Sequence, residues 1–168
     1  MLPGEATLRV GRKRFELFLM PGGKLEVTIN LPEIFWSESH LFGKKENGQL
    51  VWFEGTYAAL NTELVKHAGL MNIYSADNFY ENICGVTPAQ YKKYVTKIYE
   101  KNRGEILKNK SLSDAARTYM INKLEMSYFF AIRGYKGNIS YAPMISGKKG
   151  VKRADMTVDE SYYDDILE

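Results

Sequence analysis

The chain has 168 residues, of which 45% are hydrophobic, and its 23 Lys and Arg against 20 Asp and Glu give a formal net charge of +3. A chain of this length buries roughly 70% of its unfolded surface, enough for one domain or two small packed lobes. The charge is too small to indicate nucleic-acid or anionic-membrane binding by itself, and no apolar run approaches the ~20 residues of a membrane span. The single cysteine excludes an internal disulfide, and the start of the chain lacks a signal-peptide pattern.

The first segment, residues 1–31, predicts β structure. Apolar and polar side chains alternate at period two in three runs, which are separated by turns at Gly11 and at Pro21-Gly22-Gly23. We therefore predict a three-stranded antiparallel meander. We expect it to be the end of a larger sheet, with edge backbone groups available for pairing.

After Pro32 the strand pattern ends and residues 32–168 read as a helical region. Short helices are predicted in "EIFWSESHLF", in "GTYAALNTELVKHAG" and in "SADNFYENICG". Between the first two of these, an Asn-Gly turn is followed by a short extended run.

Two long helices are predicted to form the centre of the helical region. Thr87-Pro88-Ala89-Gln90 is a capping box with proline at the first helical position, and it begins a helix that runs to about Leu107. Ser111 with Asp114 is predicted to begin the next helix, which is the most apolar of the chain. The apolar stripe of the first long helix is expected to point inward; it comprises Tyr91, Val95, Ile98 and Ile106.

An irregular connection and a terminal helix are predicted at the C-terminal end. Residues 134–156 are rich in Gly and Lys and contain a proline, so we predict a long irregular loop there. Thr157 and Glu160 have the spacing of a capping box, which predicts a terminal helix from about residue 158. No C-cap precedes Glu168, so we expect this helix to lead into a further segment. The predicted fold class is α+β: an N-terminal three-stranded antiparallel meander followed by a mostly α-helical bundle.

Few residue types in this chain carry catalytic or metal chemistry. Cys84 is the only thiol, which favours a buried structural cysteine over a redox site. His40 and His67 have no second ligand at metal spacing, which favours single surface or core histidines. The "MPGGK" run lacks the glycine spacing, the Ser/Thr and the following helix of a phosphate loop, which favours a hairpin turn.

Charged clusters are interpreted as solvated helix faces. Four carboxylates fall on the terminal helix, where a solvated face outweighs acid–base catalysis or calcium binding; they are Asp159, Glu160, Asp164 and Asp165. One basic group lies on the first long helix, and its members are Lys92, Lys93, Lys97, Lys101 and Arg103. A second lies in the loop at 148–153 and comprises Lys148, Lys149, Lys152 and Arg153. Nucleic-acid binding is unfavoured because acidic residues are spread through the same helices. We assign no catalytic, cofactor-binding or metal-binding residue.

Four segments together resemble a known family; they are "FELFLMPGGKLEVTINLPEI", "VWFEGTYAALNTEL", "ARTYMINKLEMSYFFAIRGY" and "VDESYYDDILE". The resemblance is to the region upstream of the thioredoxin domain in secreted thioredoxin-like disulfide oxidoreductases of the TlpA/ResA type, from Gram-negative anaerobic bacteria. A "yF-x-G-x-yA-x-LN-x-EL"-like stretch of that family is matched by Phe53, Gly55, Tyr57, Ala58, Leu60, Asn61, Glu63 and Leu64. The family's catalytic C-x-x-C pair has no counterpart here, so no catalytic residue is carried over.

The resemblance implies that the chain is the end of a β-rich domain plus a helical region, located in the periplasm or cell envelope. Its implied role is non-catalytic: it positions the downstream thioredoxin domain, binds a client or partner protein, or forms a homodimer, and it needs no cofactor. The alternative is a complete small binding module. Such a module would use the basic loop for a polyanion or nucleic acid, or an apolar surface for a protein partner.

Overall fold

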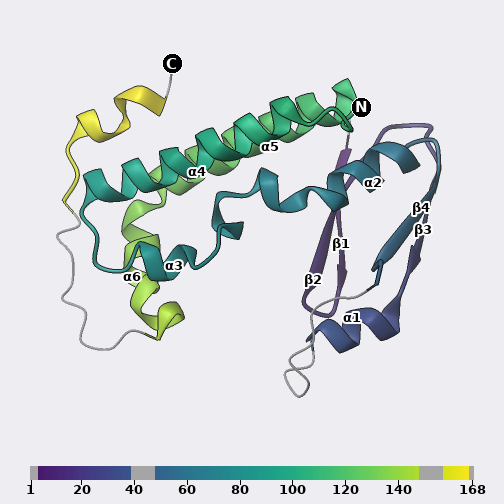
Figure 1. The fold of residues 1–168 in the computed structure, drawn as a ribbon, viewed down its shortest axis with the longest axis horizontal. Helices are drawn as coiled ribbons and strands as arrows, with labels where there is room; N and C mark the ends of the chain where they lie inside the picture. Colours follow the sequence, from purple (N-terminus) through teal and green to yellow (C-terminus); the bar gives the residue numbers. More distant parts are fainter. Residues whose placement is uncertain (1–3, 39–47, 148–156, 167–168) are drawn as a thin grey trace. The chain divides into compact units, whose positions relative to one another are not determined.

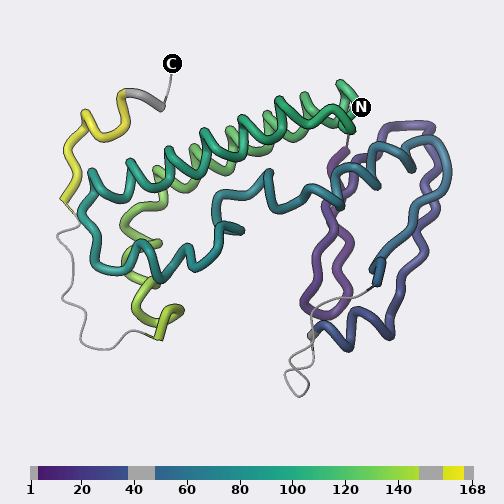
Figure 2. Tube along the Cα trace, viewed as in Figure 1, coloured from purple at the N-terminus to yellow at the C-terminus, as the bar shows by residue number. Residues whose placement is uncertain are grey.

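The computed structural model describes residues 4–38, 48–147 and 157–166. Contacts divide the chain into two compact units, residues 1–68 and residues 69–168. Strands and helices are both present, as predicted, and the described strands all belong to the first unit (Figures 1 and 2). In these three ranges, no helix has both the length and the apolar character that crossing a membrane requires.

The first unit contains two separate two-stranded antiparallel sheets and two helices. β1 (Gly4–Val10) pairs with β2 (Lys13–Leu19), and β3 (Leu25–Ile29) pairs with β4 (Val51–Gly55). The helices are α1 (Leu31–Glu38) and α2 (Ala58–Lys66). The core draws on three of these elements and comprises Phe15, Leu17, Ile34 and Val51. Because side chains alternate along a strand, Phe15 and Leu17 of β2 reach this core from the same face.

The predicted meander is corrected in its pairing, although its three strands are all present. β2 and β3 do not pair, because the outer edge of β2 is occupied by the side chain of Asn61 from α2. The backbone N–H of Phe18 donates to Oδ1 of Asn61 at 2.8 Å, and Nδ2 of Asn61 donates to the carbonyl of Phe18 at 3.0 Å. An amide side chain thus replaces a neighbouring strand, and β3 pairs with the more distant β4 instead.

The predicted division at residue 31 is corrected for the same reason. α2 packs against β2 and β4, so the structure places residues 32–68 with the strands rather than with the helical region. Local periodicity marks where strands end, but it carries no information on which later segments return to pack on them.

The second unit is helical and begins with two 3₁₀ turns and a short helix: η1 (Ala68–Met71), η2 (Ile73–Ser75) and α3 (Phe79–Asn82). Three longer helices follow: α4 (Pro88–Lys108), α5 (Asp114–Arg133) and α6 (Tyr135–Ser146). A 3₁₀ helix, η3 (Glu160–Ile166), is the last described element. α4 and α5 lie side by side along their lengths, and α6 packs against α3 (Figure 1).

The beginning of α4 confirms its predicted capping box. Oγ1 of Thr87 accepts from the amide of Gln90 at 3.3 Å, and Oε1 of Gln90 accepts from the amide of Thr87 at 2.9 Å. All members of the predicted inward stripe are buried; they are Tyr91, Val95, Ile98 and Ile106. The start of α5 is shifted, because its N-cap is Ser113 rather than Ser111, and Oγ of Ser113 accepts from the amide of Ala116.

The predicted irregular loop at 134–156 is wrong for its first half, which forms α6. Pro143 lies inside this helix although proline lacks the N–H that the helix interior uses. Burial of one face against α3 outweighs that loss, since Tyr135, Ile139 and Ala142 are all buried. The remaining part of the predicted loop, residues 148–156, lies outside the described residues.

The predicted terminal helix is present as η3, a tighter 3₁₀ helix that begins at Glu160 rather than about residue 158. Oδ1 of Asp159 accepts from the amide of Tyr162 at 3.2 Å. Asp159 therefore accepts the first-turn backbone hydrogen bond that the capping-box spacing predicted for Thr157.

Candidate functional site

The predicted thiol and the described imidazole belong to different units of the chain, and Cys84 is in the second unit. Cys84 is partly buried, and its Sγ accepts a hydrogen bond from Oγ of Ser146 at 3.8 Å. His67 follows the last turn of α2, and its backbone amide donates to the carbonyl of Glu63. His40 lies outside the described residues. No group of three or more His, Cys, Asp or Glu within the described ranges is arranged to hold a metal ion.

The "MPGGK" run forms a tight turn between β2 and β3, which do not pair with each other, so it is not the hairpin turn that was predicted. The amide of Gly23 donates to the carbonyl of Met20 at 3.0 Å, and Gly22 has a positive φ of 80°. A strand follows the turn instead of a helix, so the turn has no helix N-terminus to hold a phosphate. Gly23 also allows close packing, since a Cβ there would lie 2.4 Å from the ring of Tyr57.

The predicted acidic cluster is distributed along η3. Asp159 uses its carboxylate at the start of that helix, accepting from Ser161 as well as from the amide of Tyr162. Glu160 and Asp164 are exposed, and the side chain of Asp165 lies outside the described residues. This arrangement matches the solvated helix face that was favoured above catalysis or calcium binding.

The stretch that carries the family resemblance builds the backbone of the first unit. Gly55 has a φ of 108°, and a Cβ at this position would lie 2.2 Å from the carbonyl oxygen of Lys24. Asn61 is fully buried and holds the edge of β2, and Leu64 is fully buried. These matched residues are therefore required by backbone geometry and packing rather than by chemistry.

Three tyrosines of the second unit form a cluster around Asn138; Tyr91 and Tyr135 are buried, and Tyr74 is partly buried. The hydroxyl of Tyr91 donates to the carbonyl of Ala131 at 2.8 Å and accepts from Nδ2 of Asn138 at 2.7 Å. Nδ2 of Asn138 also donates to the hydroxyl of Tyr74 at 3.3 Å, and the ring of Tyr135 lies edge to face on Tyr91 with centroids 5.1 Å apart. Sequence periodicity indicated that Tyr91 is buried, but Asn138 gave no signal because its segment was read as a loop.

Burial controls the electrostatics of this cluster. It raises the pKa of Tyr91 and of Tyr74 above the ordinary tyrosine value, because a phenolate loses hydration there, and the hydrogen bond from Asn138 only partly opposes that shift. Both hydroxyls therefore stay protonated at neutral pH. The cluster joins α4, α5 and α6 through neutral hydrogen bonds and contains no charged acid or base.

Lys92 links α4 to η3. Its Nζ donates to the carbonyl of Tyr162 at 2.9 Å and lies 5.6 Å from the centre of the Tyr162 ring. Helical spacing predicts Lys92 on the outer, solvated face, but the structure shows it partly buried. The Tyr162 hydroxyl is buried and has no hydrogen-bond partner in the described part of the chain, and burial raises the pKa of Tyr162.

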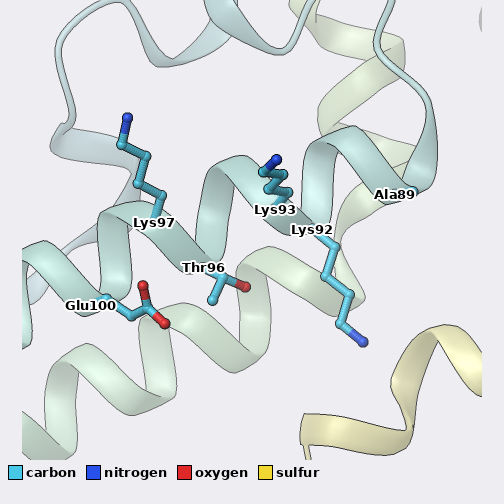
Figure 3. A pocket seen from close by; sticks show the side chains of 6 residues that line it. All are labelled: Ala89, Lys92, Lys93, Thr96, Lys97 and Glu100. Carbon is cyan, nitrogen blue, oxygen red and sulfur yellow. The ribbon is translucent and has the colours of Figure 1, made fainter.

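The predicted basic face of α4 borders an open hollow of about 580 Å³ (Figure 3). Its described lining comes from α4 alone and consists of Ala89, Lys92, Lys93, Thr96, Lys97 and Glu100. Lys93 and Lys97 point to one side of the helix, whereas Lys92 points to the other, toward η3 (Figure 3). Nζ of Lys101 lies 3.8 Å from Oε1 of Glu105 in an ion pair. Glu100 contributes a negative charge to the lining of the hollow. The ammonium groups of this face therefore do not converge on one point, as they would to hold a single anion.

Large apolar side chains are exposed at two helix ends. At the end of α6, Tyr141, Met144 and Ile145 are 59%, 72% and 53% exposed. In the first unit, Phe35 and Trp36 of α1 are 61% and 49% exposed. Clusters of this kind are typical of surfaces that bind other proteins.

Comparison of this chain with protein-family models, with curated proteins and with solved structures gave no match in any of the three.

Proposed function

We propose that this chain is a non-catalytic interaction region of a thioredoxin-like disulfide oxidoreductase of the cell envelope. In this role it positions the redox domain or binds the protein whose disulfide is reduced. The observation that carries the proposal is that residues in the matched stretch are required by the backbone of the first unit. Gly55 and Asn61 occupy places where another side chain would clash or leave backbone groups unpaired. A resemblance concentrated in such residues favours a shared architecture over a coincidence of composition.

The interaction part of the proposal is supported by the end of α6. Met144 and Ile145 are more than half exposed, and burying them against a partner would remove apolar surface from water. The redox chemistry would come from a C-x-x-C pair outside this chain. Cys84 supplies only one thiol, so it cannot close the intramolecular disulfide of a dithiol reductase.

The alternative, a polyanion-binding module, is supported by the exposed ammonium groups of Lys93 and Lys97. It is the weaker candidate because Lys92 is bonded to Tyr162 and Glu100 lies in the same lining. Salt separates the two functions: polyanion binding weakens steeply as the ionic strength rises, whereas apolar protein binding does not.

The first test is the reading frame of the source gene on both sides of this chain. We expect a thioredoxin pattern with a C-x-x-C pair downstream of the Glu168 codon. A stop codon there, or an open frame without paired cysteines, would leave the stand-alone binding module as the better account. The purified chain should show no dithiol turnover of a protein disulfide, and turnover that is lost in Cys84→Ser would mean that the chain is itself an enzyme.

The second test addresses client binding in the parent protein. Met144→Glu should raise KM for a protein disulfide about fivefold while leaving the reduction of a small-molecule disulfide unchanged, because only a protein client is large enough to reach the α6 surface. Lys136→Glu, an exposed change at the start of the same helix, is the matched control. Equal kinetics in both variants would argue against a client site at the end of α6.

A further inference from the structure

β3 is an edge strand among the described residues, since it pairs with β4 and with no other described strand. The hydrogen bonds at its two ends show which backbone groups face β4. The amide of Asn30 donates to the carbonyl of Leu50 at 2.9 Å, and the amide of Thr56 donates to the carbonyl of Lys24 at 3.0 Å. Lys24 and Asn30 flank β3, so the ladder with β4 has the same phase at both ends of the strand.

The alternation of an antiparallel ladder assigns the remaining backbone groups of β3. Glu26 and Thr28 direct their N–H and C=O groups to β4, whereas Leu25, Val27 and Ile29 direct theirs to the outer edge. In the described part of the chain, no hydrogen bond reaches these outward groups. A row of unpaired backbone donors and acceptors is a template for one more strand.

The exposed face beside this edge favours a positive charge on an added strand. Glu26 of β3 and Glu54 of β4 lie directly opposite each other, and both are exposed. Like charges at opposed positions destabilise a strand pair, and neither carboxylate forms an ion pair within the described residues. A Lys or Arg placed opposite Glu26 on a third strand would offset this repulsion.

The other face of β3 favours apolar neighbours. Val27 and Ile29 pack on the core of the first unit but are only partly buried. Directly opposed side chains lie on the same face of a sheet, so apolar residues opposite these two would cover apolar surface that is still exposed.

We propose that the outer edge of β3 binds an extended segment of another protein, which adds to the sheet as an antiparallel strand. In this segment apolar residues alternate with polar ones, and a Lys or Arg lies opposite Glu26. Main-chain hydrogen bonds supply the affinity in strand addition of this kind, and the alternate side chains supply the specificity.

A second copy of β3 fits the edge less well in its longest register. Two β3 strands that pair along their whole length have a two-fold axis at Val27. Thr28 of the second copy then lies opposite Glu26, so no positive charge reaches the carboxylate pair.

A shifted second copy corrects the charge but loses backbone pairing. Placing its Lys24 opposite Glu26 brings its Gly23 opposite Val27. Gly23 belongs to the tight turn after β2, and its amide already donates to the carbonyl of Met20 at 3.0 Å. A separate basic segment can satisfy the charge and the whole edge together, which favours another protein over a second copy.

Labelled peptides test the charge preference. The probe is fluorescein-labelled Gly-Ser-Val-Thr-Val-Lys-Val-Ser-Gly, whose antiparallel alignment sets its lysine opposite Glu26 and its central valine opposite Val27. We expect fluorescence anisotropy to show binding about fivefold tighter than that of the same peptide with glutamate in place of lysine. Glu26→Lys should invert this preference, whereas Glu100→Lys, the same change at an exposed position of α4, should leave it unchanged.

Methylated peptides separate strand pairing from charge attraction. A methyl group on the amide of the central valine removes an N–H that bonds to Val27, and it should weaken binding by about tenfold. A methyl group on the lysine amide, which faces away from β3, is the matched control and should have little effect. In the protein, the peptide should slow amide exchange of Leu25, Val27 and Ile29 but not that of Thr28, which already faces β4.

Three outcomes would each overturn the proposal: equal affinity for the lysine and glutamate peptides, binding that tolerates the methylated valine, or outer-edge amides whose exchange the peptide does not slow. A concentration-dependent dimer that protects the same amides without peptide would overturn it as well, because the edge would then belong to a second copy. Peptide binding at β3 requires neither a redox domain nor the end of α6, so its failure would leave the proposed function to its own tests.

Discussion

The two units of the chain reach their stability by different routes. The first unit has a small core, and its arrangement depends on single residues that satisfy or shape the backbone, above all Asn61 and Gly55. The second unit buries long amphipathic helices, and its polar groups meet in a neutral cluster around Tyr91. A unit with a small apolar core is destabilised strongly by a single backbone change. A helical unit with a larger core tolerates such a change better, because more apolar contacts remain.

The largest expected effect is that of Asn61→Ala on the first unit. The change leaves the N–H and C=O of Phe18 without their partners, and the two losses together should lower the free energy of unfolding by about 3 kcal/mol. Both tryptophans, Trp36 and Trp52, belong to this unit, so their fluorescence during urea unfolding reports on it. Thr62→Ala, at the exposed neighbouring position, is the control. A midpoint as high as that of the control would mean that the Asn61 bridge contributes little.

The same Gly→Ala substitution should have opposite signs in the two units. At Gly55 the positive φ and the nearby Lys24 carbonyl should make it destabilising by about 2 kcal/mol. At Gly104, inside α4 and with no atom within 4 Å of the added Cβ, it should stabilise the helix by about 1 kcal/mol. Tryptophan fluorescence and helical circular dichroism measure the two effects separately. Equal signs at both positions would contradict the expected difference in backbone sensitivity between the two units.

Alkaline pH should weaken the second unit selectively. Burial raises the pKa of Tyr91 above its unfolded value, so between these two pKa values the folded chain holds a proton that the unfolded chain releases. This contribution is complete below about pH 10 and is lost as pH rises further, by up to about 1.4 kcal/mol per pH unit for one such group. Circular dichroism melts across this range, followed together with tyrosinate absorbance, check the sign. Stability that rises above pH 10 would contradict the burial of a neutral hydroxyl.

The smallest expected effect is a gain from Tyr162→Phe. The hydroxyl of Tyr162 is buried without a partner in the described part of the chain, and its removal relieves a desolvation cost. We expect thermal stability of the second unit to increase by about 1 kcal/mol, whereas Tyr141→Phe, at a position 59% exposed, should be neutral. A loss of stability in Tyr162→Phe would indicate that the hydroxyl has a partner of its own.

Local signals explain which elements were predicted correctly. α4 was predicted from Thr87 onward because a capping box and a helical apolar stripe are both encoded within a few residues of where they act. α6 was missed because Gly137 and Pro143 disfavour a helix locally. Its formation depends on burial against α3, a contact that local propensity does not describe.

Among the candidate site residues, too, those with a local sequence signal were predicted and those that depend on tertiary contacts were not. The single cysteine already excluded a dithiol site, and the helical spacing of Tyr91 indicated its burial. Asn138, the amide at the centre of the tyrosine cluster, had no sequence signal, and neither did the bond from Lys92 to Tyr162.

The sequence by itself determined the strand runs, the main helices and the lack of a second thiol, since each of these follows from residue types within one segment. Only the tertiary structure decided which strands pair. It showed that Asn61, which is 43 positions from Phe18, closes the edge of β2, so that β3 pairs with β4. Strands from distant parts of the chain pair where their backbone N–H and C=O groups still need hydrogen-bond partners. The hydrophobic period of a single segment does not predict which partner those groups find.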